Sequence, residues 1–207
     1  MKIVVFGAGG RAGRQAVAEA RRRGHQVTAV VRDPARHGDL TDVHLVAGDV
    51  TDAGGVAQAA AGQDAAIAAA VDLSVAPHDF FTAASRALAT GLMKAGVRRL
   101  VVVGLASIMP GATGVALMDE PNYPNQYRSF YLGHAAGLGE LHTSGLDWAY
   151  LAPAGDFDHD GDRSGHYRIA AHGDATSRIS YADFAIALLD EIEAPRHHRA
   201  AASVRER

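Results

Sequence analysis

Short apolar runs alternate with alanine-rich stretches of helical period through the first half of the chain. The runs are predicted strands at residues 2–6, 26–31, 43–47, 64–70 and 98–103, and the stretches are predicted helices at 11–23, 52–61 and 79–95. Short apolar strands that alternate with helices form βαβ units, whose parallel sheet is covered on both faces. The pattern therefore predicts a doubly wound α/β fold with a mainly parallel sheet and helices on both faces.

The second half of the chain is less regular. Helices are predicted at 129–143 and 180–193, with strands at 147–151 and 198–204. Between them lie two irregular segments, at about 104–128 and 153–180, which follow predicted strands. Open α/β sheets place their ligand sites in such segments. Because no linker or repeat interrupts the chain, residues 1–207 are predicted to form a single domain with its substrate side in these two segments.

Composition excludes several classes of function. The formal net charge is −3, which argues against a general nucleic-acid surface, and the absence of cysteine excludes disulfides, thiolate metal sites and cysteine nucleophiles. The longest apolar run spans seven residues, 65–71, whereas a bilayer needs about 20. No signal-peptide pattern is present at the N-terminus. We therefore predict a cytoplasmic protein with no nucleic-acid or membrane partner.

A glycine-rich turn joins the first predicted strand to the first predicted helix: Gly7-Ala8-Gly9-Gly10-Arg11-Ala12-Gly13. In that context Gly7 permits a tight turn, Gly10 lets a pyrophosphate approach the backbone, and Gly13 allows close packing of helix on strand. The helix N-terminus adds free N–H groups and partial positive charge. The turn predicts a Rossmann-type nucleotide-binding domain; the alternative is a turn that only packs.

The end of the second predicted strand bears on which nucleotide is bound. An acidic residue directly at this point would hold a ribose 2′-hydroxyl and favour NAD(H). Arg32 comes first instead, and its guanidinium suits a 2′-phosphate, which Arg11 of the glycine-rich turn could help to hold. Asp33 precedes Pro34 and is interpreted as the start of the next turn. We therefore predict a preference for NADP(H), with two solvated arginines as the alternative.

Several motifs in the same order resemble one known family. They are residues 2–34, Gly48-Asp49-Val50-Thr51-Asp52, Val101-Val102-Val103-Gly104 with Ser107, Leu146-Asp147-Trp148 with Pro153, residues 161–168 and residues 177–185. Together they resemble the atypical short-chain dehydrogenase/reductases of the NAD(P)H-binding type. Within these they resemble the NADH-flavin reductase subgroup, relatives of biliverdin-IXβ (flavin) reductase. The resemblance covers nearly the whole chain.

The resemblance implies roles for residues at the ends of several predicted strands. Asp49 and Val50 would lie beside the adenine, and Ala69 and Ala70 would pass close to the ribose and phosphates. Ser107 would lie near the nicotinamide and could hydrogen-bond a substrate carbonyl or a flavin edge. Pro153 and Ala154 would wall the nicotinamide pocket. The alternatives are a capping or turn role for Asp49 and, for Ser107, a hydrogen bond to its own backbone.

The chain departs from the family at the proton donor. The typical Tyr-x-x-x-Lys pair is missing, because Tyr127 is followed four residues later by Tyr131, and the only lysines are Lys2 and Lys94. Ala154-Gly155 stands where the biliverdin-IXβ reductase has a histidine. A flavin or quinone can take its proton from water, so positioning alone accelerates hydride transfer to it. We therefore predict a reductase for flavins, quinones or similar conjugated acceptors, with Ser107 and Tyr127 at the acceptor.

Other functions stay open at this point. One alternative is a non-catalytic NADPH-binding regulator or redox sensor, and another is a reductase or dehydratase specialised for one secondary metabolite through Ser107 and Tyr127. The aspartates of residues 156–162, which lie near His159 and His166, are interpreted as part of a solvated loop, because the run lacks the residue order of an EF-hand calcium loop. No metal site is predicted. The sequence yields no prediction of oligomeric state.

Overall fold

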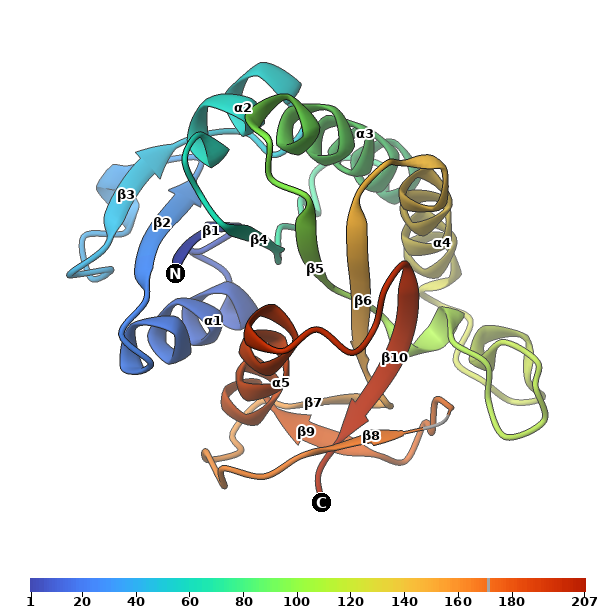
Figure 1. The fold of residues 1–207 in the computed structure, drawn as a ribbon. Helices are drawn as coiled ribbons and strands as arrows, with labels where there is room; N and C mark the ends of the chain where they lie inside the picture. The colour runs from blue at the N-terminus through green and yellow to red at the C-terminus, as the bar shows by residue number, and fades with distance from the viewer. Residues whose placement is uncertain (171) are drawn as a thin grey trace.

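The computed structural model describes residues 1–170 and 172–207. Its main sheet has the strand order β3-β2-β1-β4-β5-β6-β10-β8 (Figure 1). All neighbouring strands pair in parallel except β8, which runs antiparallel to β10 at the sheet edge. The strands are β1 (Lys2–Phe6), β2 (Gln26–Val31), β3 (His44–Ala47), β4 (Ala65–Ala68), β5 (Arg99–Val103), β6 (Asp147–Pro153), β8 (Arg168–Ala170) and β10 (Ala200–Arg205). The predicted doubly wound, mainly parallel fold is confirmed.

Helices cover both faces of this sheet, as Figure 1 shows. On one face lie α1 (Arg11–Arg22) and α5 (Tyr181–Glu193), and on the other lie α2 (Ala53–Ala60), α3 (Pro77–Ala95) and α4 (Arg128–Thr143). Alternate residues of β1 supply the two cores: Ile3 and Val5 join the α1/α5 side, and Val4 and Phe6 join the other. Burial on both faces explains why these strands read as continuous apolar runs.

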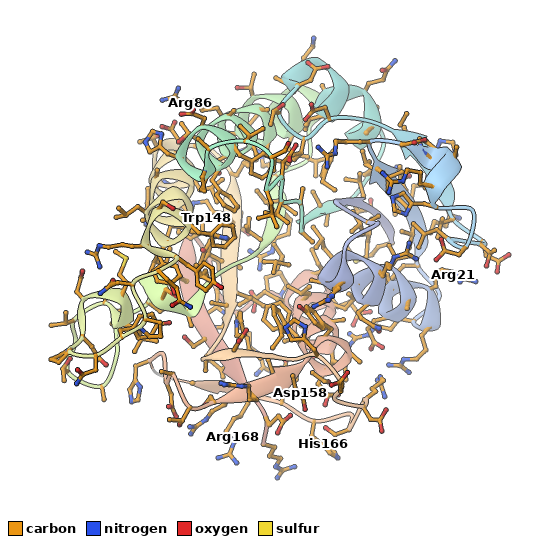
Figure 2. All side chains as sticks on the ribbon, turned by 180° about the vertical axis from the view of Figure 1, so that it is seen from behind. Arg21, Arg86, Trp148, Asp158, His166 and Arg168 are labelled. Atoms are coloured by element: carbon orange, nitrogen blue, oxygen red, sulfur yellow. The ribbon has the colours of Figure 1, made fainter. Side chains whose placement is uncertain are left out.

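Small side chains let the helices of the second layer approach closely. A Cβ on Gly91 of α3 would lie 2.7 Å from the carbonyl oxygen of Ala53, the first residue of α2. Trp148, the one tryptophan, is fully buried beneath α4, whereas Arg86 of α3 extends outward into solvent (Figure 2). The high alanine and glycine content is therefore a requirement of this helix packing.

The predicted elements agree with the observed ones to within a few residues, and the differences lie near strand ends. β4 ends at Ala68, so Ala69 and Ala70 leave the sheet, and α3 begins at Pro77. The segment predicted as irregular at 153–180 contains β7 (Asp156–Asp158), β8 and β9 (Arg178–Ser180), with β7 and β9 paired in parallel. Strands of three residues are too short to show a period, so the sequence did not predict them.

Two short 3₁₀ turns interrupt the other irregular segment, η2 (Ala106–Ile108) and η3 (Leu117–Asp119). A further 3₁₀ turn, η1 (Pro34–Arg36), follows β2. None of the helices that the structure describes is both long and apolar enough to cross a membrane. Within residues 1–170 and 172–207, no three histidine, aspartate or glutamate side chains gather as a metal site would require.

Candidate functional site

The glycine-rich turn connects β1 to α1 and is closely packed. Gly7 has φ +78°, and a Cβ there would lie 2.5 Å from the Cα of Ala70, so both backbone conformation and space require glycine. A Cβ on Gly13 would lie 2.1 Å from the carbonyl oxygen of Gly7. The first turn of α1 therefore packs directly on the turn that precedes it. The segment after β4 passes beside Gly7.

Gly10 differs from these two because space is free around it. It caps the N-terminus of α1 in an extended conformation, and a Cβ there would meet nothing closer than 3.5 Å. No acidic side chain lies in the first turn of the helix, and no side chain caps it. The unpaired N–H groups and the positive end of the helix dipole are thus available to an anion. A dinucleotide pyrophosphate fits this backbone cradle.

A cleft of about 620 Å³ opens beside the cradle at the carboxyl ends of the parallel strands. It is lined by the turn after β1, the ends of β2 and β3, the segment after β4, and the first residues of α3. Among the predicted cofactor residues, those that line it are Gly7, Gly10, Arg32, Asp49, Val50, Ala69 and Ala70. Its volume and apolar walls suit the adenosine half of a dinucleotide.

Asp49 and Val50 follow β3 at the rim of the cleft. One carboxylate oxygen of Asp49, Oδ1, accepts hydrogen bonds from the backbone N–H and the hydroxyl of Thr51, each at 2.8 Å. Asp49 therefore forms a local turn, which is the alternative considered from the sequence, and it is also exposed to the cleft, so its place beside the adenine stays a prediction. The side chain of Val50 is buried and forms part of the apolar wall.

Two arginines, which form a group of cations, and a histidine lie where β2 ends. Arg32 lines the cleft and forms an ion pair with Asp72 from the segment after β4. Arg36 and His37, which sequence reasoning did not select, line the same part of the cleft. Asp33 caps η1 by accepting a hydrogen bond from the Ala35 N–H at 3.1 Å, so it is the turn residue that the sequence predicted.

Three other predicted cofactor residues lie outside this cation group. Arg11 contacts His159, which follows β7, and therefore does not join Arg32 as the sequence reasoning expected. Ala8 is fully buried and its N–H donates to the carbonyl of Val30 at 3.2 Å. Ala12 is half-buried in the first turn of α1. These two alanines support the turn from the protein interior and do not line the cleft.

A pair of hydroxyl groups lies at the same sheet edge after β5, where the sequence predicts the acceptor. Ser107 lies in η2, just after β5, and its Oγ is 2.9 Å from the Tyr123 hydroxyl. Tyr123 packs edge-to-face against Tyr131, whose own hydroxyl donates to the Pro124 carbonyl at 3.1 Å. Tyr127, by contrast, is 60% exposed at the N-cap of α4. The structure thus brings Tyr123, and not Tyr127, to Ser107.

A buried hydrogen-bond chain fixes the segment that carries Ser107. The Leu105 N–H donates to the Tyr150 hydroxyl at 3.0 Å, and that hydroxyl lies 2.9 Å from Nδ1 of His134. Burial raises the pKa of Tyr150 and lowers the pKa of His134 to about 3. Since Tyr150 keeps its proton and accepts from Leu105, it donates to a neutral His134 imidazole.

Pro153 is the last residue of β6 and Ala154 follows it, and both side chains are buried. The Ala154 N–H donates to the Val204 carbonyl at 2.7 Å, and its carbonyl accepts from the Asp174 N–H at 2.7 Å. Neither residue lines the 620 Å³ cleft. Their predicted role as the wall of a nicotinamide pocket stays a prediction.

Two residues at this edge, Asp72 and Tyr123, were not predicted from the sequence, and a signal existed for the first of them only. Asp72 follows β4 and Arg32 follows β2, and the carboxyl ends of parallel strands meet at one edge, which brings such residues together. Tyr123 lies in an irregular segment where spacing carries no geometric information, so only the structure could pair it with Ser107.

Comparison with known proteins agrees with this geometry. The family model described as NAD(P)H-binding matches residues 7–195. YwnB, an uncharacterised protein of Bacillus subtilis, is 37% identical over 95% of this chain and 94% of its own. A "putative exported protein" from Burkholderia pseudomallei is 38% identical, with a TM-score of 0.87 over 99% of both chains. A "putative NADH-flavin reductase" from Streptococcus pneumoniae is 31% identical, with a TM-score of 0.85 over the whole of both chains.

The matched region contains the glycine-rich turn, the cleft residues after β2, β3 and β4, and the hydroxyl pair after β5. The fold, the phosphate cradle and this match over most of the sequence agree with one another. The chain belongs to the NAD(P)H-binding family.

Proposed function

We propose that this protein is an NAD(P)H-dependent reductase that transfers hydride to a flavin, a quinone or a similar conjugated acceptor, with NADPH as the preferred donor. The observation that carries the proposal is the pairing of two sites on one sheet edge. The open phosphate cradle and adenosine-sized cleft lie after β1 to β4, and the Ser107–Tyr123 hydroxyl pair lies after the adjacent strand, β5. A dinucleotide bound along that edge places its two ends at these two sites.

The cofactor end of the proposal rests on the cradle and its cations. Gly10 leaves the N-terminus of α1 open to the pyrophosphate, and Arg32 and Arg36 stand where the adenosine ribose would lie. A guanidinium holds a phosphate through charge and paired hydrogen bonds. This arrangement supports NADPH over NADH. A cytoplasmic location, where such a donor is regenerated, forms part of the proposal.

The acceptor part of the proposal rests on the absence of a lysine that could acidify a tyrosine of the hydroxyl pair. Neither lysine of the chain follows Tyr123 or Tyr127 by four residues, so no Tyr-x-x-x-Lys pair supplies an acidified tyrosine. A conjugated ring system that takes up hydride spreads the new electron pair over heteroatoms and collects its proton from water. Ser107 and Tyr123 would then orient the acceptor by hydrogen bonds. The motifs at 161–168 and 177–185 support a place in the flavin reductase subgroup related to biliverdin-IXβ reductase.

The test is turnover with a panel of acceptors. Purified protein with NADPH or NADH is mixed with FMN, riboflavin, a simple quinone and an unactivated ketone, and loss of nicotinamide absorbance is followed. We expect oxidation with the first three acceptors, faster with NADPH, and none with the ketone. Gly10→Ala, purified identically, is the control, because its methyl group enters the cradle without touching protein atoms closer than 3.5 Å.

Two outcomes would overturn the proposal. Tight binding of NADPH with no turnover of any acceptor would favour the non-catalytic regulator. Turnover of the ketone at a rate matching the flavin would show that the site supplies its own proton donor, as a specialised carbonyl reductase does.

A further inference from the structure

The ion pair between Arg32 and Asp72 crosses the part of the cleft where the adenosine ribose would lie. Arg32 extends from the end of β2, and Asp72 comes from the segment between β4 and α3. Both line the cleft, and so does Arg36, for which no ion pair is found in the described part of the chain. An acidic group is therefore present beside the predicted 2′-phosphate site. In NAD-selective folds such a group follows the second strand, whereas here Asp72 comes from the segment after β4.

The two oxygens of Asp72 have separate partners. Oδ1 accepts from the N–H of Ser74 at 2.9 Å and from its hydroxyl at 2.6 Å, which forms a local turn. Oδ2 is the atom that faces Arg32. These contacts hold the pKa of Asp72 below its ordinary value, with the Ser74 hydroxyl as the largest contribution. The Asp72 side chain is 16% exposed and that of Arg32 66%, so a mostly buried carboxylate pairs with a solvent-exposed guanidinium.

We propose that Asp72 is a specificity-determining residue that occupies Arg32 and so limits the preference for NADPH over NADH. The inference rests on the proposed use of this cleft for the cofactor. A 2′-phosphate competes with Oδ2 for Arg32, and its charge of about −1.5 to −2 also meets the repulsion of the Asp72 carboxylate. A ribose 2′-hydroxyl, by contrast, donates a hydrogen bond to Oδ2, as it does to the acidic residue of NAD-selective sites.

The substitution Asp72→Asn tests this competition with little disturbance of the segment. The amide oxygen of asparagine still accepts from Ser74, whereas the amide nitrogen cannot accept from Arg32. The matched control is Asp79→Asn. Asp79 lines the same cleft, its side chain is 75% exposed, and its ion-pair partner is the neighbouring His78, so the control removes an equal charge without releasing an arginine.

Affinities are measured for NADPH, NADH and 2′,5′-ADP, the last because it carries the 2′-phosphate without a nicotinamide. An exposed ion pair of this kind corresponds to roughly a fivefold change in binding. We expect Asp72→Asn to bind NADPH and 2′,5′-ADP about fivefold more tightly and NADH no more tightly than the parent. Asp79→Asn should change the NADPH-to-NADH affinity ratio by less than about twofold.

An unchanged affinity ratio in Asp72→Asn would overturn the inference, and weaker NADPH binding would overturn it by showing that the carboxylate positions Arg32 for the phosphate. An equal shift of the affinity ratio in Asp79→Asn would mean that any negative charge in the cleft has this effect, and it would also overturn the inference. These results leave the proposed reductase function standing if turnover is observed. A parent protein that binds neither nucleotide would remove the reductase proposal and this inference together.

Discussion

Tyr123 and Tyr127 are four residues apart but lie in different surroundings. The hydroxyl of Tyr123 pairs with a buried serine, whereas Tyr127 stands at the start of α4 with most of its surface in solvent. Under the proposed function this hydroxyl pair, which has no neighbouring lysine, would orient the acceptor by hydrogen bonds, each of which contributes about 1 kcal/mol. The contribution of each tyrosine to catalysis should follow this difference.

We expect Tyr123→Phe to lower kcat/KM for flavin reduction about fivefold, since one orienting hydrogen bond is lost. Tyr127→Phe, the matched control, should leave kcat/KM within about twofold because its hydroxyl has no recorded partner in the described residues. Steady-state kinetics with FMN and NADPH provide the measurement. A loss of a hundredfold or more at Tyr123 would mark it as a proton donor and contradict protonation by water.

Two glycines of the phosphate turn, Gly10 and Gly13, allow nucleotide binding to be tested separately from folding. A methyl group on Gly10 occupies free space in the cradle, whereas one on Gly13 collides with the Gly7 carbonyl. Gly10→Ala should fold normally and lose tenfold or more in NADPH affinity, roughly the loss of one phosphate contact. Gly13→Ala should lose about 1–3 kcal/mol of unfolding free energy. Urea unfolding and NADPH titration on both variants distinguish the cases; equal stability in the two would contradict the close packing.

At the scale of elements, a charged cluster joins α1 to α5. Glu19 of α1 is 4% exposed and accepts from Arg22 at 2.6 and 2.8 Å and from Arg23 at 2.9 Å. Arg23, just beyond α1, also reaches Asp190 and Glu193 of α5, at 2.7 and 2.6 Å. The hydrogen bond from Arg22 is the largest contribution to lowering the pKa of Glu19 to about 2. Glu19 therefore holds Arg23 in position between the two helices.

Replacement of Glu19 by Gln should lower the free energy of unfolding at pH 7 by about 3 kcal/mol, because the folded state loses the charge-assisted contacts of a buried carboxylate with Arg22 and Arg23. The folded-state pKa is depressed, so this contribution is present above pH 4.5 and fades as the pH falls toward 2. The difference between parent and variant, measured by urea unfolding, should shrink accordingly. Glu140→Gln, which breaks the exposed pair with Arg86, serves as control and should cause a much smaller change.

At the scale of the whole molecule, His134 couples stability to pH. Its ring is buried against Phe81 and Phe130, and Tyr150 is the titratable group that faces it. The unfolded chain takes up a proton on this residue below about pH 6.5, whereas the folded protein does so only near pH 3. The stability present above pH 6.5 is therefore lost as the pH falls, by up to about 1.4 kcal/mol per unit.

Between pH 7 and pH 5 this linkage amounts to about 2 kcal/mol of unfolding free energy. His134→Gln keeps a hydrogen-bond acceptor for Tyr150 and does not titrate, so the stability difference between the parent and this variant should change by about 2 kcal/mol over that interval. The difference between the parent and the exposed His78→Gln variant should stay nearly constant. Chemical denaturation at several pH values provides the comparison, and a difference between the parent and His134→Gln that does not change with pH would refute the burial argument.

The fold and half of the site could be predicted because their signals are local. The glycine-rich turn needs only its neighbouring strand and helix, and each buried strand shows its own apolar run. The remaining features depend on distant contacts: Arg11 meets a histidine 148 residues away, and Arg32 meets Asp72 through strand order. The Ser107–Tyr123 pair depends on the course of an irregular segment. Composition and spacing do not specify such a course.

The two ends of the candidate site come from separate stretches of the chain. Every residue that lines the cleft falls between Phe6 and Ala83, whereas the hydroxyl pair and its buried support fall between Leu105 and Tyr150. Under the proposed function, a single genetic crossover near Gly96, in the turn before β5, would exchange acceptor recognition between relatives and leave nucleotide selection intact. The hybrid must keep the contacts between the two halves matched, among them those of α3 with α4, where a Cβ on Gly137 would lie 3.0 Å from the Cβ of Phe81.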